Sequence, residues 1–304
     1  MDSRVFGVLL TLLFVSSIQA SPKIEHWQTE NGARVYFVPA PELAMVDITV
    51  AFDAGAARDD TKSGLALLTN AMLNEGAAGL NTDQIAIEFE DVGAQFSNSS
   101  QRDMAILSLR TLTDKTAFEP ALAMFNNVLT KPDFPSESFE RIQKQMMIGL
   151  QAEKQSPSAI SSRAFYGNLY GDHPYGSMPA GTEHSVSQLT LESLKRFYQQ
   201  YYVANNAVVV LVGALDSAQA KIVAEQLLSG LAEGEEAKPL VPVMPLSQGK
   251  TIAIEHPSTQ THIVMGQTGI SRGDADYFAL YVGNHILGGS GLVSQLSNEV
   301  REKR

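Results

Sequence analysis

The order of extended and helical segments along residues 25–228 most constrains the fold of this chain. Three stretches with alternating apolar residues come first, and the Asn31-Gly32 turn between the first two is typical of a hairpin. Prolines 132, 135 and 157 separate helical patterns, where helices should begin or stop. We expect strands at 25–27, 34–38, 46–52, 94–99, 104–111 and 207–212, and helices at 62–73, 82–91, 118–129, 136–155, 158–170, 189–202 and 217–228. This order predicts an α+β domain over residues 21–230, in which a mixed antiparallel sheet packs with helices.

The helix expected at 82–91 has signals at both of its ends. Thr82, followed by Asp83, is the expected N-cap, because its hydroxyl can accept a hydrogen bond from a free backbone N–H group. Gly93 is the expected C-terminal stop.

The composition changes after this domain. Residues 231–249 are rich in Ala, Glu, Pro and Lys, and Pro239, Pro242 and Pro245 predict a stiff, extended linker that is not an element of either neighbouring unit. Strands at 251–255 and 262–267 and helices at 276–287 and 293–303 should follow. A hairpin with two helices has no complete sheet to cover, so residues 250–304 predict the start of a second α+β unit that is incomplete.

The first twenty residues have the pattern of a secretory signal. Arg4 precedes an apolar stretch over residues 5–15, which is too short for a membrane span of ~20 residues, and Ala20 ends the segment. An uncleaved anchor is the alternative reading. We expect cleavage after residue 20 and export, with the periplasm of a Gram-negative bacterium as the expected location and no membrane attachment afterwards.

Composition excludes several kinds of chemistry. The chain contains 0 cysteines, so it has no disulfide framework and no thiolate nucleophile. The net charge of -11 and the lack of any Lys/Arg run argue against nucleic-acid binding. None of the six histidines stands four residues from another, as the two ligands of a helical zinc motif must.

The helix expected around residues 63–73 carries the most informative motif. With the extended segment before it, it resembles the first helix of the inverted-zincin peptidases, the pitrilysin and insulinase (M16) family, whose pattern is G-x-A-H-x-x-E-H-M-L. In this chain the two His positions hold Leu67 and Ala71, and the Glu position holds Asn70. The family's chemistry needs two imidazoles one turn apart and a carboxylate that takes a proton from a metal-bound water. The resemblance therefore implies the fold, and these residues lack the catalytic groups.

The resemblance extends over nearly all of the expected mature chain. The Asp172-His173-Pro174-Tyr175-Gly176 loop, the Tyr201-Tyr202 segment that leads into the 207–212 strand, and the helix–glycine loop–helix around residues 286–304 are all similar to the family's segments. Its third zinc ligand, a Glu, falls on Gly149, and Glu140 and Glu153 lie too far from that position to replace it. We therefore expect no zinc and no other cofactor in this chain.

The resemblance also implies a peptide-binding role for the second unit. Arg301 falls on an Arg that holds the substrate backbone, and the glycines of the 288–291 loop, Gly288, Gly289 and Gly291, fall on a peptide-contacting loop. The Tyr that follows this Arg by seven residues in the family would be residue 308. An ordinary solvated Arg and a simple turn between helices are the alternatives.

Three functions are compatible with this pattern. The resemblance favours the non-catalytic subunit of a periplasmic two-chain zinc peptidase, in which a partner subunit carries the zinc, and this chain forms half of the peptide-binding chamber. A zinc-free structural scaffold with no role in proteolysis is the second. An autonomous zinc peptidase with displaced ligands is the third, and the residues favour it least.

Overall fold

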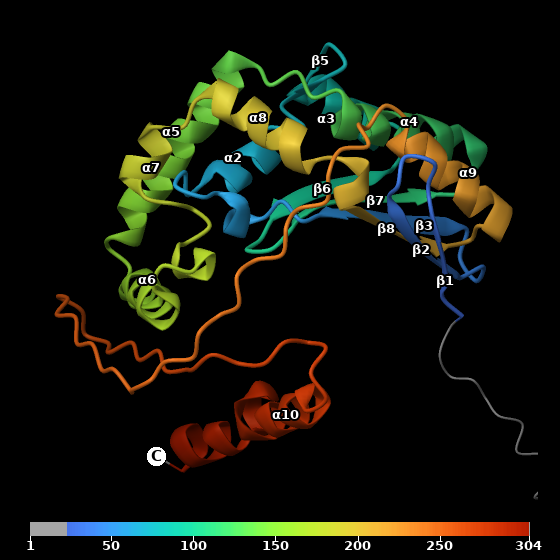
Figure 1. The fold of residues 1–304 in the computed structure, drawn as a ribbon. Coiled ribbons are helices and arrows are strands. Elements are labelled where there is room, and N and C mark those ends of the chain that lie inside the picture. Colours follow the sequence, from blue (N-terminus) through green and yellow to red (C-terminus); the bar gives the residue numbers. More distant parts are fainter. Residues whose placement is uncertain (1–22, 304) are drawn as a thin grey trace, which may run out of the picture.

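A six-stranded mixed sheet forms the framework of the first unit (Figure 1). The computed structural model describes residues 23–303, so the expected signal segment at 1–20 lies outside the described residues. In spatial order the strands are β1 (Glu25–Gln28), β2 (Arg34–Pro39), β8 (Ala207–Gly213), β3 (Met45–Phe52), β7 (Ala105–Leu112) and β6 (Gln95–Ser100). β2 pairs in parallel with β8, and the other neighbours pair antiparallel. A short hairpin, β4 (Gly76–Ala77) and β5 (Leu80–Asn81), stands apart from this sheet.

Some helices of the first unit cover one face of the sheet, and others lie to the side of it, away from the strands (Figure 1). They are α2 (Leu65–Ala71), α3 (Thr82–Glu90), α4 (Lys115–Thr130), α5 (Ser136–Glu153), α6 (Pro157–Tyr170), α7 (Glu183–Ser187), α8 (Leu191–Tyr201) and α9 (Ser217–Leu228). Alternate residues of the inner strands are buried under them. In β8, for example, Val209 and Leu211 are fully buried, whereas Val208 and Val210 on the opposite face are half-buried. The expected α+β fold, a mixed sheet packed with helices, is confirmed.

Local signals placed most helix ends within a few residues, but the expected N-cap of α3 was wrong. Its N-cap is Asn81 and not Thr82: the Asn81 side chain accepts a hydrogen bond from Gln84 N, and the Gln84 side chain accepts one from Asn81 N, each at 3.0 Å. This reciprocal capping box satisfies two N–H groups that would otherwise lack partners. Thr82 is the first residue inside the helix.

The motif helix α2 begins three residues later than expected, at Leu65. Gly64 has φ +100°, which is not helical, and its backbone N–H donates to the Asp59 carboxylate at 2.8 Å. The same carboxylate accepts from Ala66 N at 2.7 Å. Asp59 therefore satisfies the free N–H groups at the start of α2 from outside the helix.

The second half of the chain differs from the prediction. The strands expected at 251–255 and 262–267 were wrong, because these residues are extended but pair with no strand among residues 23–303. Almost all of their side chains are exposed, so no neighbouring strand or apolar layer holds them in a sheet. The expected helices are present in part: α10 (Tyr277–Asn284) continues into wider helical turns at His285–Gly289, and another such turn spans Ser297–Glu302.

No helix in the described part of the chain combines the length and apolar character that crossing a bilayer requires.

Candidate functional site

Helix α2 lies where the sheet ends, beside the edge strand β6. It contacts β6, α8 and α5, and Figure 1 shows it beneath α8 on the helix-covered side of the sheet. The Asn98 side chain of β6 donates a hydrogen bond to Asn70 O at 2.6 Å, which ties the last turn of α2 to the strand. β6 has β7 on one side and, among residues 23–303, no strand on the other. The motif positions therefore lie next to an open sheet edge.

The three motif residues of α2 are buried to different extents. Leu67 and Ala71, one turn apart, are half-buried, whereas Asn70 is only 2% exposed. The Asn70 amide lies 3.4 Å from the hydroxyl of Tyr202, which is itself buried. Burial also raises the pKa of Tyr202, so its hydroxyl stays neutral. Asn70 is thus part of a buried polar contact. Its amide cannot act as a base.

The position expected for the third ligand is open. Gly149 is exposed on α5, and a Cβ atom built there would meet no atom within 4 Å. The acidic residues nearby are engaged or turned outward. Glu75 pairs with Arg141, Glu153 pairs with Arg163 at 2.7 Å, and Glu140 is exposed.

These residues do not fit a zinc ion of the kind the family motif holds. A catalytic zinc site takes three nitrogen, sulfur or oxygen ligands from the protein, whereas leucine and alanine have no donor atom and glycine has no side chain. Within residues 23–303, no three His, Asp or Glu side chains are grouped closely enough to hold a metal ion. No catalytic step through zinc is therefore assigned to these positions.

Among the described residues, Asp59 is the acid beside α2 whose pKa is strongly perturbed. Burial raises the pKa of its carboxyl to about 7, although the N–H groups of Ala66 and Gly64 favour the charged form. Perturbed acids are often found at active sites. The two backbone N–H groups occupy this carboxylate, however, so its role is to order the start of α2.

The residues of the second unit lie apart from α2. Arg301 is exposed in the last helical turn and makes no ion pair with any described residue. Gly288 and Gly289 end the helical turn after α10, and a Cβ on Gly288 would lie 3.1 Å from Leu296 Cδ1. Gly291 has φ +61°, a backbone conformation that favours glycine. The glycine loop therefore joins two helical turns, and no hydrogen bond in the described residues links it to α2.

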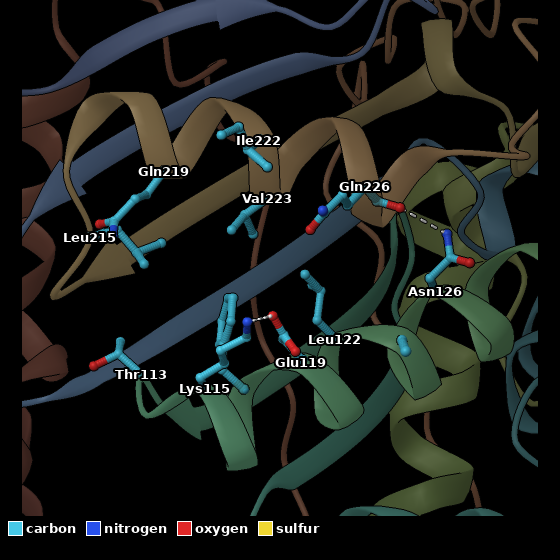
Figure 2. A pocket seen from close by; sticks show the side chains of 12 residues that line it. Thr113, Lys115, Glu119, Leu122, Asn126, Leu215, Gln219, Ile222, Val223 and Gln226 are labelled. Atoms are coloured by element: carbon cyan, nitrogen blue, oxygen red, sulfur yellow. Dashed lines mark hydrogen bonds and ion pairs between the residues drawn. The ribbon is translucent and has the colours of Figure 1, made fainter.

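A shallow hollow between α4 and α9 is a second concave surface (Figure 2). Its walls are mainly apolar, with Phe118 and Leu122 on α4 and Ile222 and Val223 on α9. The charged groups that line it are Lys115 and Glu119, which pair with each other at 3.5 Å. It contains no histidine and no free acid, so it offers no catalytic group.

Two contacts of the motif helix were missed in the sequence. Tyr202 was noted only as part of a segment similar to the family, and Asn98 only as part of a strand. No local pattern connects either residue with Asn70, because these contacts span 132 and 28 residues. Asp59 had a weak signal, since an acid a few residues before a helix commonly accepts its free N–H groups.

Comparison with known proteins identifies the family. The model for the insulinase family of peptidases (family M16) matches residues 34–183, and the model for the M16 inactive domain matches residues 188–304. A crystal structure of a peptidase M16 inactive domain from Pseudomonas fluorescens is 40% identical, with a TM-score of 0.87, and the match covers 93% of this chain and 68% of that one. A protease structure from Helicobacter pylori has the same fold at 19% identity, with a TM-score of 0.76 over 93% of this chain and 69% of that one.

Curated relatives agree with these structures. An uncharacterised zinc protease of Rickettsia felis is 23% identical over 90% of this chain, and the chain spans 66% of its length, just under two thirds. The zinc protease PqqE of Helicobacter pylori is 24% identical over 82% of this chain and 57% of its own length. The fold, the two family models and the 40% identical structure lead to one conclusion: the chain belongs to the M16 (insulinase) peptidase family.

Proposed function

We propose that this protein is the non-catalytic subunit of an exported, two-chain M16-type zinc peptidase, in which it forms half of the peptide-binding chamber. One observation carries the proposal: the motif helix is kept in place beside an open sheet edge, while every position for a zinc ligand or base lacks the required group. In this proposal the zinc is supplied by a partner subunit that belongs to the same family.

The open edge gives the chain a means of holding a peptide without a metal. An extended peptide can add to a sheet edge through backbone hydrogen bonds, which require no particular peptide sequence. On β6, Gln95, Ser97 and Ser99 have exposed side chains, so a peptide there would lie against a polar strand. If the chain holds the peptide so that its scissile bond lies at the partner's metal, this positioning would lower the activation barrier for hydrolysis.

In the same proposal, Arg301 and the glycine loop guide the peptide. The guanidinium is exposed and has no partner in residues 23–303, so it is available to bind a peptide carbonyl or carboxylate. Gly288, Gly289 and Gly291 allow a peptide backbone to approach closely, because they have no side chain.

A zinc-free scaffold is the second candidate, and the burial of Asn70 favours it. A base position that has become part of a buried polar contact has a structural role. The two candidates differ in one respect: Arg301 and the glycine loop bind a peptide in the subunit proposal and do not in the scaffold proposal.

Affinity capture of the tagged, full-length protein from its native cells tests the proposal. We expect a zinc-bearing M16 protein to co-purify, with peptide hydrolysis only in the complex. In that complex, Arg301→Ala should raise KM. Lys303→Ala is the control, because Lys303 is two residues away and pairs with Glu299 at 2.6 Å. Recovery of the chain alone, without metal or activity, would reject the subunit proposal in favour of the scaffold.

A further inference from the structure

Residues 232–241, the first half of the expected linker, lie along the first unit and are bound to it. Ala204 N donates to Ala232 O at 2.8 Å, and Asn205 N donates to Glu233 O at 3.0 Å. Farther along, Ala237 N donates to the Asn206 side chain at 3.1 Å. We call this segment the strap.

A largely covered arginine of the first unit holds the middle of the strap. Arg58 forms two hydrogen bonds with the Asp53 carboxylate, and its remaining terminal nitrogen donates to Lys238 O at 2.7 Å. The Arg58 side chain is only 9% exposed, although its contact with Lys238 lies at the exposed strap. His173 makes the last contact with the strap. Its Nδ1 accepts a hydrogen bond from Tyr175 N, so its Nε2 carries the proton and donates to Val241 O at 2.9 Å.

The strap is bound mainly through its backbone, since most of its side chains are exposed. One residue type is nevertheless required. Gly234 has φ +62°, and a Cβ on it would lie 2.4 Å from Val203 Cβ. Only glycine allows the strap to lie this close to the first unit.

Contacts become sparse after Val241. Residues 242–249 make no hydrogen bond with another described segment, and the next contacts are the exposed Lys250–Asn168 pair and Gly266 against the Phe165 ring. A Cβ on Gly249 would meet no atom within 4 Å. Residues 242–249 are therefore the part of the expected linker that no hydrogen bond holds to the first unit.

We propose that the strap is a fixed part of the first unit and that the hinge between the two units lies at residues 242–249, instead of at the end of α9. Arg58 ends the short helical turn Ala56–Arg58, which contacts α2, and it directly precedes Asp59, which caps α2. The position of the strap is thus linked to the start of the motif helix. This inference does not depend on the proposed function.

Spin-label distances in the full chain test the hinge, and the absence of cysteine makes labelling specific. Lys195 on α8 is exposed and makes no hydrogen bond with a described residue, so Lys195→Cys serves as the reference. Paired with Lys238→Cys it should give a narrow distance distribution, and paired with Ser247→Cys a distribution roughly twofold wider.

A matched pair of glycine variants makes the test specific. Gly234→Ala should widen the 195–238 distribution about twofold, to the width expected of an untethered chain. Gly249→Ala should leave it unchanged. Equal widths for the two label pairs, or no response to Gly234→Ala, would overturn the proposal. Circular dichroism of each variant shows whether the first unit is still folded, and a widened distribution in a folded variant supports the hinge.

Discussion

Asn70 shows at the residue scale what has replaced the family's catalytic chemistry. Its side chain is buried and lies beside the Tyr202 hydroxyl. A Glu at this position would place a carboxylate in a buried site, where a charge without a partner is costly. Leu67 and Ala71 are half-buried, and changes there should be tolerated more easily. Restoring the motif on α2 alone should therefore not restore the enzyme.

The variant Leu67→His, Asn70→Glu, Ala71→His should have no peptidase activity, because Gly149 still leaves the metal without its third ligand. We also expect it to lose about 1–3 kcal/mol in the free energy of unfolding, mainly because Asn70→Glu buries an acid. Urea unfolding and a peptide-hydrolysis assay measure both effects. The double variant Leu67→His, Ala71→His is the control and should be more stable than the triple variant. Robust hydrolysis by the triple variant would show that Gly149 is not the missing ligand position.

Asp59 should make stability depend on pH. Burial raises the pKa of its carboxyl from 3.8 to about 7 in the folded protein. An acid whose pKa is higher in the folded state contributes stability below its unfolded pKa and loses it as pH rises through the folded value. The contribution of Asp59 to the free energy of unfolding should thus decrease as the pH rises from about 4 to about 7. Asp59→Asn removes this group, so subtracting its urea-unfolding profile from that of the unmodified protein isolates the effect. A difference that is flat over this range would contradict the assignment.

Most elements of the first unit could be predicted because their signals are local, whereas α7 and the β4–β5 hairpin were missed. Alternating apolar residues identified β2, β3 and β7, and prolines marked the starts of α5 and α6. A strand also needs a neighbouring strand to pair with, and the sequence pattern does not show whether one is present. Residues 251–255 have strand-like alternation but no neighbouring strand among the described residues. The motif helix was placed from its pattern, whereas its contacts with Asn98, Tyr202 and Asp59 depend on tertiary packing.

The start of α3 provides a test at the scale of one element. Asn81→Ala should lower the free energy of unfolding by about 1 kcal/mol, because it removes the acceptor for Gln84 N. Thr82→Ala should cost less, since Thr82 is inside the helix and is not its cap. Urea unfolding of both variants distinguishes the two residues, and a larger loss for Thr82→Ala would reject Asn81 as the cap.

At the scale of the whole molecule, the second unit exposes an unusual amount of apolar surface. Phe278 is 76% exposed and Val293 is 85% exposed, and Leu280, Tyr281 and Leu292 are also exposed. Exposed apolar side chains in such number promote association. The first unit has its own buried core of strands and helices.

The 304-residue chain should therefore associate in isolation, whereas a version that ends after Gly249 should remain monomeric with a similar melting temperature. Light scattering coupled to size-exclusion chromatography, together with calorimetry, checks both expectations. A single sharp melting transition of the 304-residue chain in a monodisperse monomer would contradict this account.

The central claim is that the chain keeps the M16 fold without a zinc site of its own. The most direct test is to dialyse the purified, full-length protein against zinc, measure bound metal by mass spectrometry and assay the same sample for peptide hydrolysis. The account predicts far less than one zinc per chain and no hydrolysis, and adding Gly149→Glu to the triple motif variant should raise the bound zinc toward one per chain. One tightly bound zinc in the unmodified protein, together with hydrolysis that a chelator abolishes, would contradict it.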